Sequence, residues 1–371
     1  MKKQLVLIGG GHAHMTTLAN LHLFLAKGYD ATVIGPSPHH YYSGMGPGML
    51  AKVYRPEEIR FNTQQMVEKQ GATFVLGKAV RIDARAKAVH LADGQALPYD
   101  VLSCNAGSAV PQTLPGMETA KELFSVKPIE RLMEAQAHLL ALAGQKQISV
   151  AIIGGGPSAV EVAGNVWRLL HDAKVAPPRI TVFAGSRLMP KQPDSIRSRA
   201  QRSLARRGIE IISPARVREI RDGQVVLDSG SSHGADLIFL ALGIKPSPLF
   251  ADSELAIGPD GGLLVNEYLQ CPQYPEIFGG GDCIHFMPQP LDKVGVYAVR
   301  QNLVLLHNLL ASLEGKPLEK FEPGGDYLLI YNLGDDTGIL RKRGLIFGGR
   351  LAFWLKDYID RRFMRKFQAG Q

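Results

Sequence analysis

The 371-residue chain has few cysteines, and their spacing excludes several kinds of site. Cys104, Cys271 and Cys283 are the only three, and no two stand in a C-x-x-C or C-x-x-x-x-C arrangement. A disulfide framework, a zinc site of the usual spacing and a local redox disulfide are therefore excluded. We interpret the three as structural thiols of a reducing compartment.

Long apolar runs are also absent. No stretch reaches the roughly 18 consecutive apolar residues that indicate a membrane-spanning helix. The apolar run at the N-terminus is too short for a signal peptide and passes directly into glycines. We therefore expect a cytoplasmic protein, with a peripheral position on the inner face of a membrane as the alternative.

The charge balance points to anionic partners. Charged residues make up 20% and hydrophobic residues 45% of the chain, which is a globular composition. The formal net charge of +8 favours nucleotides or anionic lipid as partners. No module that reads nucleic acid accompanies the charge, and no cluster of metal ligands stands out, so we expect neither nucleic acid nor metal. The length predicts two or three domains.

Two glycine motifs mark the starts of two similar units. Residues 4–10 read as an apolar strand that runs into Gly9 and Gly11, followed by a helical pattern over residues 14–28. The pattern returns 145 positions later with Gly154, Gly156 and Ala159. The first glycine permits the turn, the second lets a pyrophosphate approach, and a small third residue lets helix and strand pack closely. In the first unit the third position is His14, so we expect an altered but working site in which this histidine, like His12, is phosphate-side or structural.

The repeated units predict an α/β fold of two interleaved Rossmann-like domains, each with three ββα layers, and a C-terminal amphipathic helical extension. Each unit continues into a small antiparallel meander and a closing strand. We predict an FAD-binding domain from residues 1–112 and 247–320, an NAD(P)H-binding domain from residues 113–246, and a separate C-terminal region from residues 321–371.

Five motifs give the chain a resemblance to a known family: GGGHAH, NAGS, GGGPSAVEVAG, LALGIKP and IFGGGDC, in this order. The chain resembles the two-dinucleotide-binding flavoproteins of the type II NADH dehydrogenase and sulfide:quinone reductase group. The stretches YYSGMGPGML, GVYAVRQN and WLKDYIDRRFMRKF are most similar to the flavoprotein module that is sometimes fused ahead of selenophosphate synthase.

The resemblance implies FAD in the first unit and NADH or NADPH in the second. The candidate positions for FAD are Gly9, Gly11, His12, His14, Ala106, Gly107, Gly281 and Asp282. The candidate positions for the nicotinamide cofactor are Gly154, Gly156, Ala159 and Gly243, together with Arg187, which is either a cofactor contact or a surface residue.

The resemblance also implies an FAD-dependent NAD(P)H dehydrogenase that passes electrons to a quinone or another small acceptor, with Glu161, Gln301 and Lys293 as candidate catalytic residues. One alternative is a sulfide or polysulfide:quinone reductase, which would use Cys104 or Cys283. Another is a flavin-bearing redox or regulatory module that acts as a partner to another protein, for instance in selenium metabolism.

Some positions depart from the family pattern. The strands that end at Gly35 and Ala184 lack the acidic residue that usually binds an adenosine ribose. Since Ser186 and Arg187 follow Ala184, NADPH is not excluded. Val296 and Arg300 stand where the quinone motif has glutamines, although Gln301 is kept.

The C-terminal tail has helical periodicity. Apolar side chains recur on one predicted face, at Leu351, Trp354, Leu355, Tyr358, Ile359, Phe363 and Phe367. The rest of the segment is mostly basic, with Arg350, Lys356, Arg361, Arg362, Arg365 and Lys366. An apolar face with basic flanks predicts binding to a peripheral membrane surface through residues 347–368. The alternatives are a helix packed on its own domain and a homodimer contact.

Overall fold

The computed structural model describes residues 2–368. Five parallel strands form the first sheet, in the order β21 (Ile277–Gly279), β9 (Val101–Cys104), β1 (Gln4–Ile8), β2 (Asp30–Gly35) and β5 (Thr73–Leu76). The central strand β1 and its neighbour β9 are almost continuous apolar runs because helices and loops cover both faces of such a sheet.

A second parallel sheet repeats this arrangement. Its order is β11 (Leu123–Ser125), β18 (Leu237–Leu240), β12 (Ser149–Ile153), β13 (Arg179–Phe183) and β14 (Glu210–Ile212). The strand that precedes each glycine motif, β1 or β12, is central in its sheet. The predicted fold class, with two Rossmann-like units, is confirmed.

Small sheets complete the two units, and all of them are antiparallel except the parallel pair of β20 and β22. One meander consists of β6 (Ala79–Asp83), β7 (Ala88–Leu91) and β8 (Ala96–Pro98), and the other of β15 (Val217–Arg221), β16 (Gln224–Leu227) and β17 (Ser232–Gly234). Two-stranded pairs join β3 (His39–Tyr41) to β4 (Arg60–Asn62), and β20 (Leu263–Val265) to β22 (Ile284–Phe286). Where the chain crosses between the units, β10 (Ser108–Ala109) pairs antiparallel with β19 (Lys245–Pro246), beside the predicted boundaries at 112 and 247.

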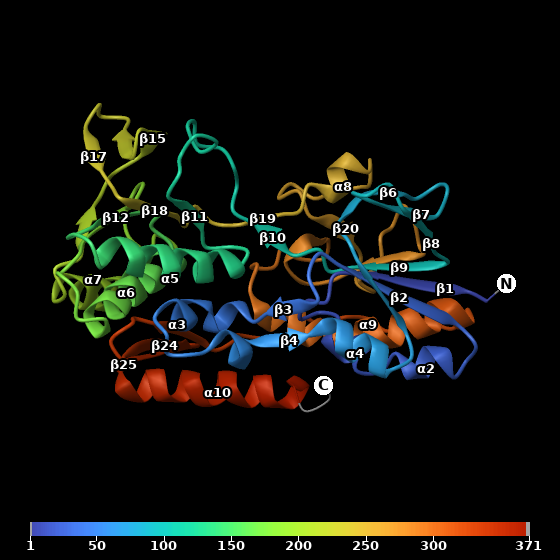
Figure 1. Ribbon diagram of the computed structural model, residues 1–371. Helices are drawn as coiled ribbons and strands as arrows, with labels where there is room; N and C mark the ends of the chain where they lie inside the picture. The colour runs from blue at the N-terminus through green and yellow to red at the C-terminus, as the bar shows by residue number, and fades with distance from the viewer. Residues whose placement is uncertain (1, 369–371) are drawn as a thin grey trace.

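The helices flank the sheets, as Figure 1 shows. In the second unit they are α5 (Glu130–Ala143), α6 (Pro157–Asp172) and α7 (Asp194–Ala205). In the first unit they are α4 (Thr63–Lys69), α8 (Leu249–Asp252), α9 (Gly295–Glu314) and the two short helices α1 (Met15–Leu18) and α2 (His22–Leu25). The short helix α3 (Gly46–Leu50) comes from the first unit but packs on α5 and α6.

The single helix expected over residues 14–28 is interrupted. Helices α1 and α2 are separated at residues 19–21, where the side-chain amide of Asn20 donates to the carbonyl oxygen of Thr16 at 2.8 Å. This local bond competes with continued helical pairing. The apolar periodicity was correct, since Met15, Leu18, Leu21 and Phe24 are all buried.

The C-terminal region is a three-stranded antiparallel sheet followed by one long helix. The strands are β23 (Leu329–Asn332), β24 (Gly338–Lys342) and β25 (Leu345–Gly349), and the helix is α10 (Arg350–Gln368). Figure 1 shows α10, in red, along the lower side of the molecule, from below the second unit to near β4 of the first. It packs on its own sheet and on β4 of the first unit. The last three residues of the predicted region lie outside the described residues.

The structure corrects the predicted apolar and basic faces of α10, because some of the residues assigned to them are buried in the protein. Of the seven apolar residues, Phe367 is buried, Leu355 and Phe363 are partly buried, and only Leu351, Trp354, Tyr358 and Ile359 are exposed. Lys356, expected on the basic surface, is buried and forms an ion pair with the buried Asp360 at 2.5 Å. Helical periodicity assigns a charged residue to the exposed face. Lys356 can nevertheless be buried, because the Asp four residues later neutralises its charge inside the protein.

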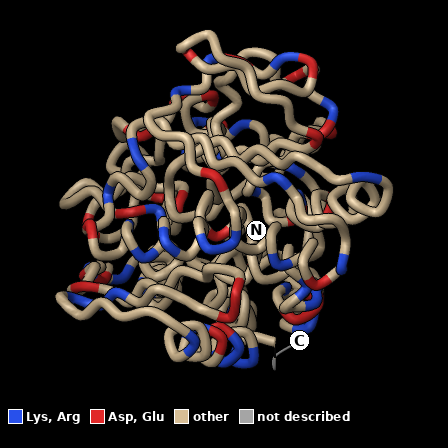
Figure 2. Tube along the Cα trace, turned by 90° about the vertical axis from the view of Figure 1, so that its left-hand side faces the viewer, with Lys and Arg blue, Asp and Glu red and all other residues tan. Residues whose placement is uncertain are grey.

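At the end of the molecule that carries the second unit, the basic residues are not gathered into one patch. Figure 2 looks onto the end of the molecule that carries the second unit, and basic and acidic residues are interspersed over it. Many of them form surface ion pairs, such as Lys146 with Asp236 and Arg168 with Asp336.

Candidate functional site

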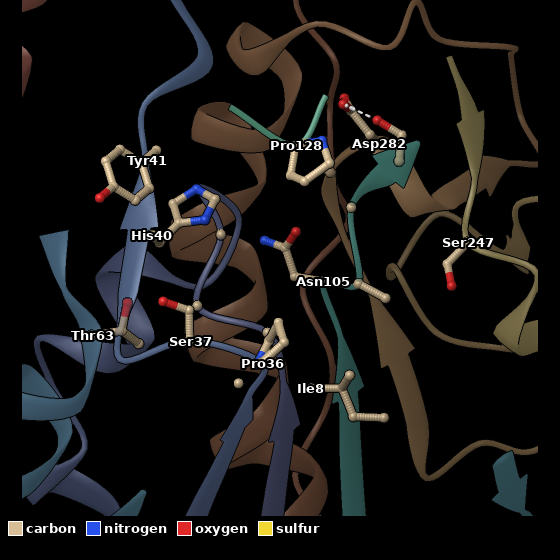
Figure 3. Close-up of a pocket in the computed structure, with 18 of the residues that line it drawn as sticks. Ile8, Pro36, Ser37, His40, Tyr41, Thr63, Asn105, Pro128, Ser247 and Asp282 are labelled. Atoms are coloured by element: carbon tan, nitrogen blue, oxygen red, sulfur yellow. Dashed lines mark hydrogen bonds between the residues drawn. The ribbon is translucent and has the colours of Figure 1, made fainter. Parts of the chain in front are cut away.

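A cavity of about 360 Å³ lies at the carboxyl ends of the strands of the first sheet. This edge is where open α/β sheets bind ligands. The glycine turn after β1, the first turn of α9 and residues 105–108 after β9 all line it. In Figure 3, Asn105 lies between Ile8 at one end of this first cavity and Pro128 and Asp282 at the other.

The glycines of the first motif are required by close packing. Gly9 has φ +88°, and a Cβ at this position would collide with the carbonyl oxygen of Asn105. A Cβ on Gly11 would lie 2.8 Å from Oδ1 of the same asparagine. The turn therefore brings backbone amides to the cavity wall without side chains in front of them.

His14, at the third position of the motif, is a structural residue and does not line the cavity. It is fully buried, with Nδ1 2.7 Å from the carbonyl oxygen of Gly9 and Nε2 2.8 Å from Oγ of Ser103. Burial lowers the pKa of His14 to about 4, although the Gly9 carbonyl opposes this shift, so the ring is neutral. Of the two roles expected for His14, phosphate-side or structural, these contacts support the structural one, because both ring nitrogens are already engaged within the protein.

His12 lies on the cavity wall in an aromatic cluster. Its ring stacks on Phe363 of α10, with centroids 5.5 Å apart, and meets His40 edge to face. Burial and the neighbouring His40 lower the pKa of His12 to about 3. The side chain is thus a neutral hydrogen-bonding group at neutral pH.

Unsatisfied polar atoms in the first cavity fit the cofactor that the sequence implied. Nε2 of His12, Oγ1 of Thr63 and Nδ2 of Asn105 are buried without a hydrogen-bond partner among residues 2–368, and all three residues line the cavity. Buried polar groups are rarely left unpaired, so these atoms indicate a polar ligand. The diphosphate and ribityl groups of FAD supply the hydrogen-bonding atoms that such a wall requires.

Asp282 closes one end of the first cavity together with Lys127. Its Oδ2 accepts hydrogen bonds from Nζ of Lys127 at 2.7 Å and from Oγ of Ser108 at 2.9 Å. Burial opposes ionisation of this carboxyl, but the lysine and the hydroxyl lower its pKa below the usual value. Sequence reasoning missed Lys127, because this residue belongs to no motif and lies 155 residues from Asp282 in the chain.

A second cavity occupies the corresponding edge of the second sheet. It is lined by the glycine turn after β12, the end of β13, the segment before β15 and the two crossing segments, including Gly154, Phe183, Gly185, Arg216, Arg218 and Lys245. Gly154 has φ +138°, and a Cβ there would collide with the carbonyl oxygen of Ala241. Gly156 is the N-cap residue of α6, and Ala159 in the first turn of this helix is fully buried.

Of the five positions predicted for the nicotinamide cofactor, only Gly154 lines this cavity, and Gly156, Ala159, Arg187 and Gly243 lie outside the lining. Arg187 is exposed on the loop after β13, where its guanidinium reaches the carbonyl oxygen of Pro190 at 3.5 Å. Gly243 is exposed with φ +87°, next to the lining residue Leu242. In the first unit, Ala106, Gly107 and Gly281 do line their cavity.

Glu161 lies on α6 facing the C-terminal region. Its Oε1 accepts a hydrogen bond from the backbone N–H of Asn332 at 2.8 Å. Burial raises the pKa of Glu161 to about 6, with Lys356 opposing the shift. Lys356 in turn donates to the carbonyl oxygen of Gly44 at 2.7 Å. Lys356, whose charge acts on the Glu161 carboxyl, thus also holds the loop that supplies Ser43 to the first cavity.

Gln301 and Lys293 are engaged by protein groups. Oε1 of Gln301 accepts from the backbone N–H of Gly281 at 2.7 Å, and the side chain is 1% exposed. Nζ of Lys293 forms an ion pair with Asp260 at 2.8 Å. Neither residue lines the first or the second cavity, so the contacts that the structure shows are positioning contacts.

The three cysteines are free and buried. Burial raises the pKa of Cys104 well above its usual value and that of Cys283 to about 11. Sγ of Cys283 lies 3.4 Å from the carbonyl oxygen of Cys104. Thiols of this kind are poor nucleophiles, which agrees with the structural interpretation.

Comparison with known proteins places this arrangement among flavoenzymes. The family model described as pyridine nucleotide-disulphide oxidoreductase matches residues 3–302. The chain is 26% identical to ferroptosis suppressor protein 1 of Taeniopygia guttata, over 93% of this chain and 90% of that protein. It is 24% identical to the type II NADH:quinone oxidoreductase of Staphylococcus saprophyticus, over 98% and 96%.

A solved structure has the same fold. The sulfide:quinone oxidoreductase of Aquifex aeolicus superposes with a TM-score of 0.82 at 20% identity, covering 100% of this chain and 92% of that one.

Proposed function

Because the chain belongs to the pyridine nucleotide-disulphide oxidoreductase family, we propose that it is an FAD-dependent NAD(P)H dehydrogenase that passes electrons to a quinone. One observation carries this proposal. Ser108 and Ser247 line the first cavity, whereas Pro111 and Lys245 line the second, so the β10–β19 crossing separates two sites of the same kind. The relative from S. saprophyticus, similar over nearly the whole chain, is a type II NADH:quinone oxidoreductase.

The residues of the first cavity would hold FAD, which, when bound, supplies the two-electron chemistry between nicotinamide and acceptor. Asn105, Thr63 and His12 offer the unsatisfied polar atoms, and Gly9 and Gly11 leave backbone amides open to the diphosphate. Asp282, kept ionised by Lys127, is an acceptor for ribityl hydroxyls. Gln301 holds the Gly281 turn in place.

Glu161 is suited to proton handling. Quinone reduction consumes protons, and a carboxyl whose pKa is raised to about 6 holds and releases a proton near neutral pH. We propose that Oε2 of Glu161 does so, since Oε1 is occupied by the backbone N–H of Asn332. The buried Lys356 is the cation that compensates the ionised carboxyl.

The exposed face of α10 favours a lipid-soluble acceptor. A surface groove on this helix is lined by Tyr358, Ile359, Arg362, Phe363 and Lys366. Phe363 belongs both to this groove and to the aromatic cluster around His12. No helix of residues 2–368 is long and apolar enough to cross a bilayer. We therefore propose that the protein lies peripherally on an anionic membrane, with the groove as the approach for a quinone.

The proposal is tested by anaerobic titration of the purified protein. We expect a yellow protein with one non-covalent FAD that NADH or NADPH bleaches and that a quinone reoxidises. Sulfide should not bleach it, because Cys104 and Cys283 are buried with raised pKa values. Bleaching by sulfide alone would favour the sulfide:quinone reductase alternative. If neither nucleotide reduces the flavin, the regulatory-module alternative is favoured. That alternative is supported by YYSGMGPGML, GVYAVRQN and WLKDYIDRRFMRKF, the stretches similar to the flavoprotein module fused ahead of selenophosphate synthase.

A further inference from the structure

The wall of the second cavity lacks a carboxylate where dinucleotide sites usually have one. The strand β13 ends at Phe183, and the next residue, Ala184, is fully buried and offers no polar group. An acidic side chain at this strand end normally accepts the hydroxyls of the adenosine ribose, and it also repels a phosphate there. The position is therefore open to an additional negative charge.

Arg216 is held beside this strand end by backbone hydrogen bonds. The N–H of Ala215 donates to the carbonyl oxygens of Ala184 at 2.9 Å and Gly185 at 3.1 Å. Two residues earlier in the same segment, Oγ of Ser213 donates to the carbonyl oxygen of Ser186 at 3.1 Å. The residues before β15 thus run alongside residues 184–186, although about 30 positions separate the two segments.

The guanidinium of Arg216 is available to a ligand. Its side chain is 85% exposed, and its ion pair with Asp228 is long, at 3.6 Å. An exposed pair of this length contributes little energy and is easily exchanged. The neighbouring Arg218 is less free, because it forms a shorter pair with Glu219 at 3.0 Å.

The charges that line the second cavity favour an anion. They comprise three cations, Arg216, Arg218 and Lys245, and one carboxylate, Asp228. A guanidinium binds phosphate through charge-assisted, often bidentate hydrogen bonds. The exposed Arg187 and Ser186, on the loop after β13, lie at the same strand end and add a further cation and a hydroxyl.

We infer that the second cavity discriminates in favour of NADPH, with Arg216 as the residue that binds the 2′-phosphate of the adenosine ribose. The inference rests on the proposed function, since it requires a nicotinamide dinucleotide in this cavity. It goes beyond that proposal because it selects one of the two nucleotides and names the discriminating side chain.

The test measures adenosine fragments, so that it does not depend on flavin chemistry. Isothermal titration of the FAD-loaded protein with adenosine 2′,5′-bisphosphate and with 5′-AMP should show the bisphosphate binding about 10- to 100-fold more tightly. The preference should shrink as salt concentration rises, because the contact is exposed and ionic.

Three variants locate the preference. Arg216→Ala should reduce the preference for the bisphosphate to about twofold or less. Because Arg216 is exposed, this variant should fold normally. Gly185→Asp should abolish the preference, and a Cβ at Gly185 meets open space, so the variant introduces the missing carboxylate without a clash. Arg206→Ala removes an exposed arginine directly after α7, outside the cavity lining, and should leave the preference unchanged.

Equal binding of the two fragments, binding of neither, or an unchanged preference in Arg216→Ala would overturn the inference. A protein that prefers the bisphosphate but whose flavin no nucleotide reduces would instead overturn the proposed dehydrogenase activity and leave the inference standing.

Discussion

Nε2 of His14 lies 2.8 Å from Oγ of Ser103, and this contact joins the start of α1 to the strand β9 inside the first unit. Nδ1 of the same ring faces the carbonyl oxygen of Gly9, which can only accept, so the proton is on Nδ1 and Nε2 accepts from the serine. In other dinucleotide-binding turns, a small third residue lets the helix pack closely on the strand. Here the hydrogen bond between His14 and Ser103 holds the helix to the strand instead.

Replacing His14 should therefore destabilise the protein more than it impairs cofactor contacts. His14→Ala leaves two buried polar groups without a partner and creates a cavity, so we expect the free energy of unfolding to fall by roughly 2–5 kcal/mol. Urea denaturation at pH 7.5 measures this. The control is His22→Ala, because His22 is exposed and should change stability little. Equal stabilities for the two variants would contradict the structural role.

The same residue predicts a pH dependence of stability. The pKa of His14 falls from its ordinary value of 6.5 to about 4 on folding, chiefly by burial. Its contribution to stability is therefore fully present above pH 6.5 and is lost as pH falls through 4. His14→Ala should accordingly lose less stability than the wild type between pH 6.5 and pH 4. His12 and His40, whose pKa values are also lowered by burial, keep part of the dependence in both proteins.

Asp282 and Lys127 should act together in FAD retention. Asp282→Ala removes an acceptor at the cavity end, and we expect FAD affinity to fall by about tenfold or more. Lys127→Ala leaves the partly buried carboxylate without its cation. The double variant should show a coupling of roughly 0.5–3 kcal/mol in FAD binding, measured by fluorescence titration of the deflavinated protein.

Lys146→Ala is the matched control, because Lys146 forms a surface pair with Asp236 in the second unit. It should leave FAD affinity unchanged. Full flavin content in Asp282→Ala, or strictly additive effects of Asp282→Ala and Lys127→Ala, would contradict the assignment.

Glu161 should govern the pH profile of quinone-linked turnover. Its carboxyl is protonated below about pH 6, and the protonated fraction falls as pH rises through that value. We expect an inflection near pH 6 in the wild type that disappears in Glu161→Gln, with reduction of the flavin by NAD(P)H less affected than its reoxidation. Glu134→Gln, on the exposed face of α5, is the control. If the inflection near pH 6 persists in Glu161→Gln, the titrating group is not Glu161.

The exposed residues of α10 should hold the protein at membranes. The structure rules out simple deletion of the helix as a clean test, because Met364, Phe367 and the Lys356–Asp360 pair are buried. The combined variant Leu351→Ser, Trp354→Ser, Tyr358→Ser and Ile359→Ser removes only exposed apolar groups. Partial insertion of these four side chains is worth several kcal/mol, since full burial of each gives roughly 1.5–3 kcal/mol.

We expect the wild type to sediment with phosphatidylglycerol vesicles at low salt and the combined variant to stay in the supernatant. The variant should also turn over long-tailed quinones more slowly while its flavin is reduced normally. Leu303→Ser, at an exposed position of α9, is the control. The wild type could instead fail to bind vesicles and behave as a dimer in analytical ultracentrifugation. That result would assign this face of α10 to self-association.

The sequence by itself determined the doubled architecture, because its signals are local. A glycine that must adopt φ +88° or +138° between a buried strand and a helix specifies a turn within a few residues, and the repeat at Gly9 and Gly154 specifies two of them. The oxidoreductase class followed from the same motifs, and the family match over residues 3–302 confirms it.

Only the tertiary structure decided which side chains share a site. Lys127 meets Asp282, and Arg216 stands beside Ala184, across distances in sequence that no periodicity connects. The C-terminal helix shows the same limit. Its periodicity predicted a helix correctly, but burial of the Lys356–Asp360 pair depends on the polar groups that Gly44 and Tyr42 present from the first unit. A charged side chain can be buried only where hydrogen-bonding or oppositely charged groups surround it, and here some of those groups come from distant parts of the chain.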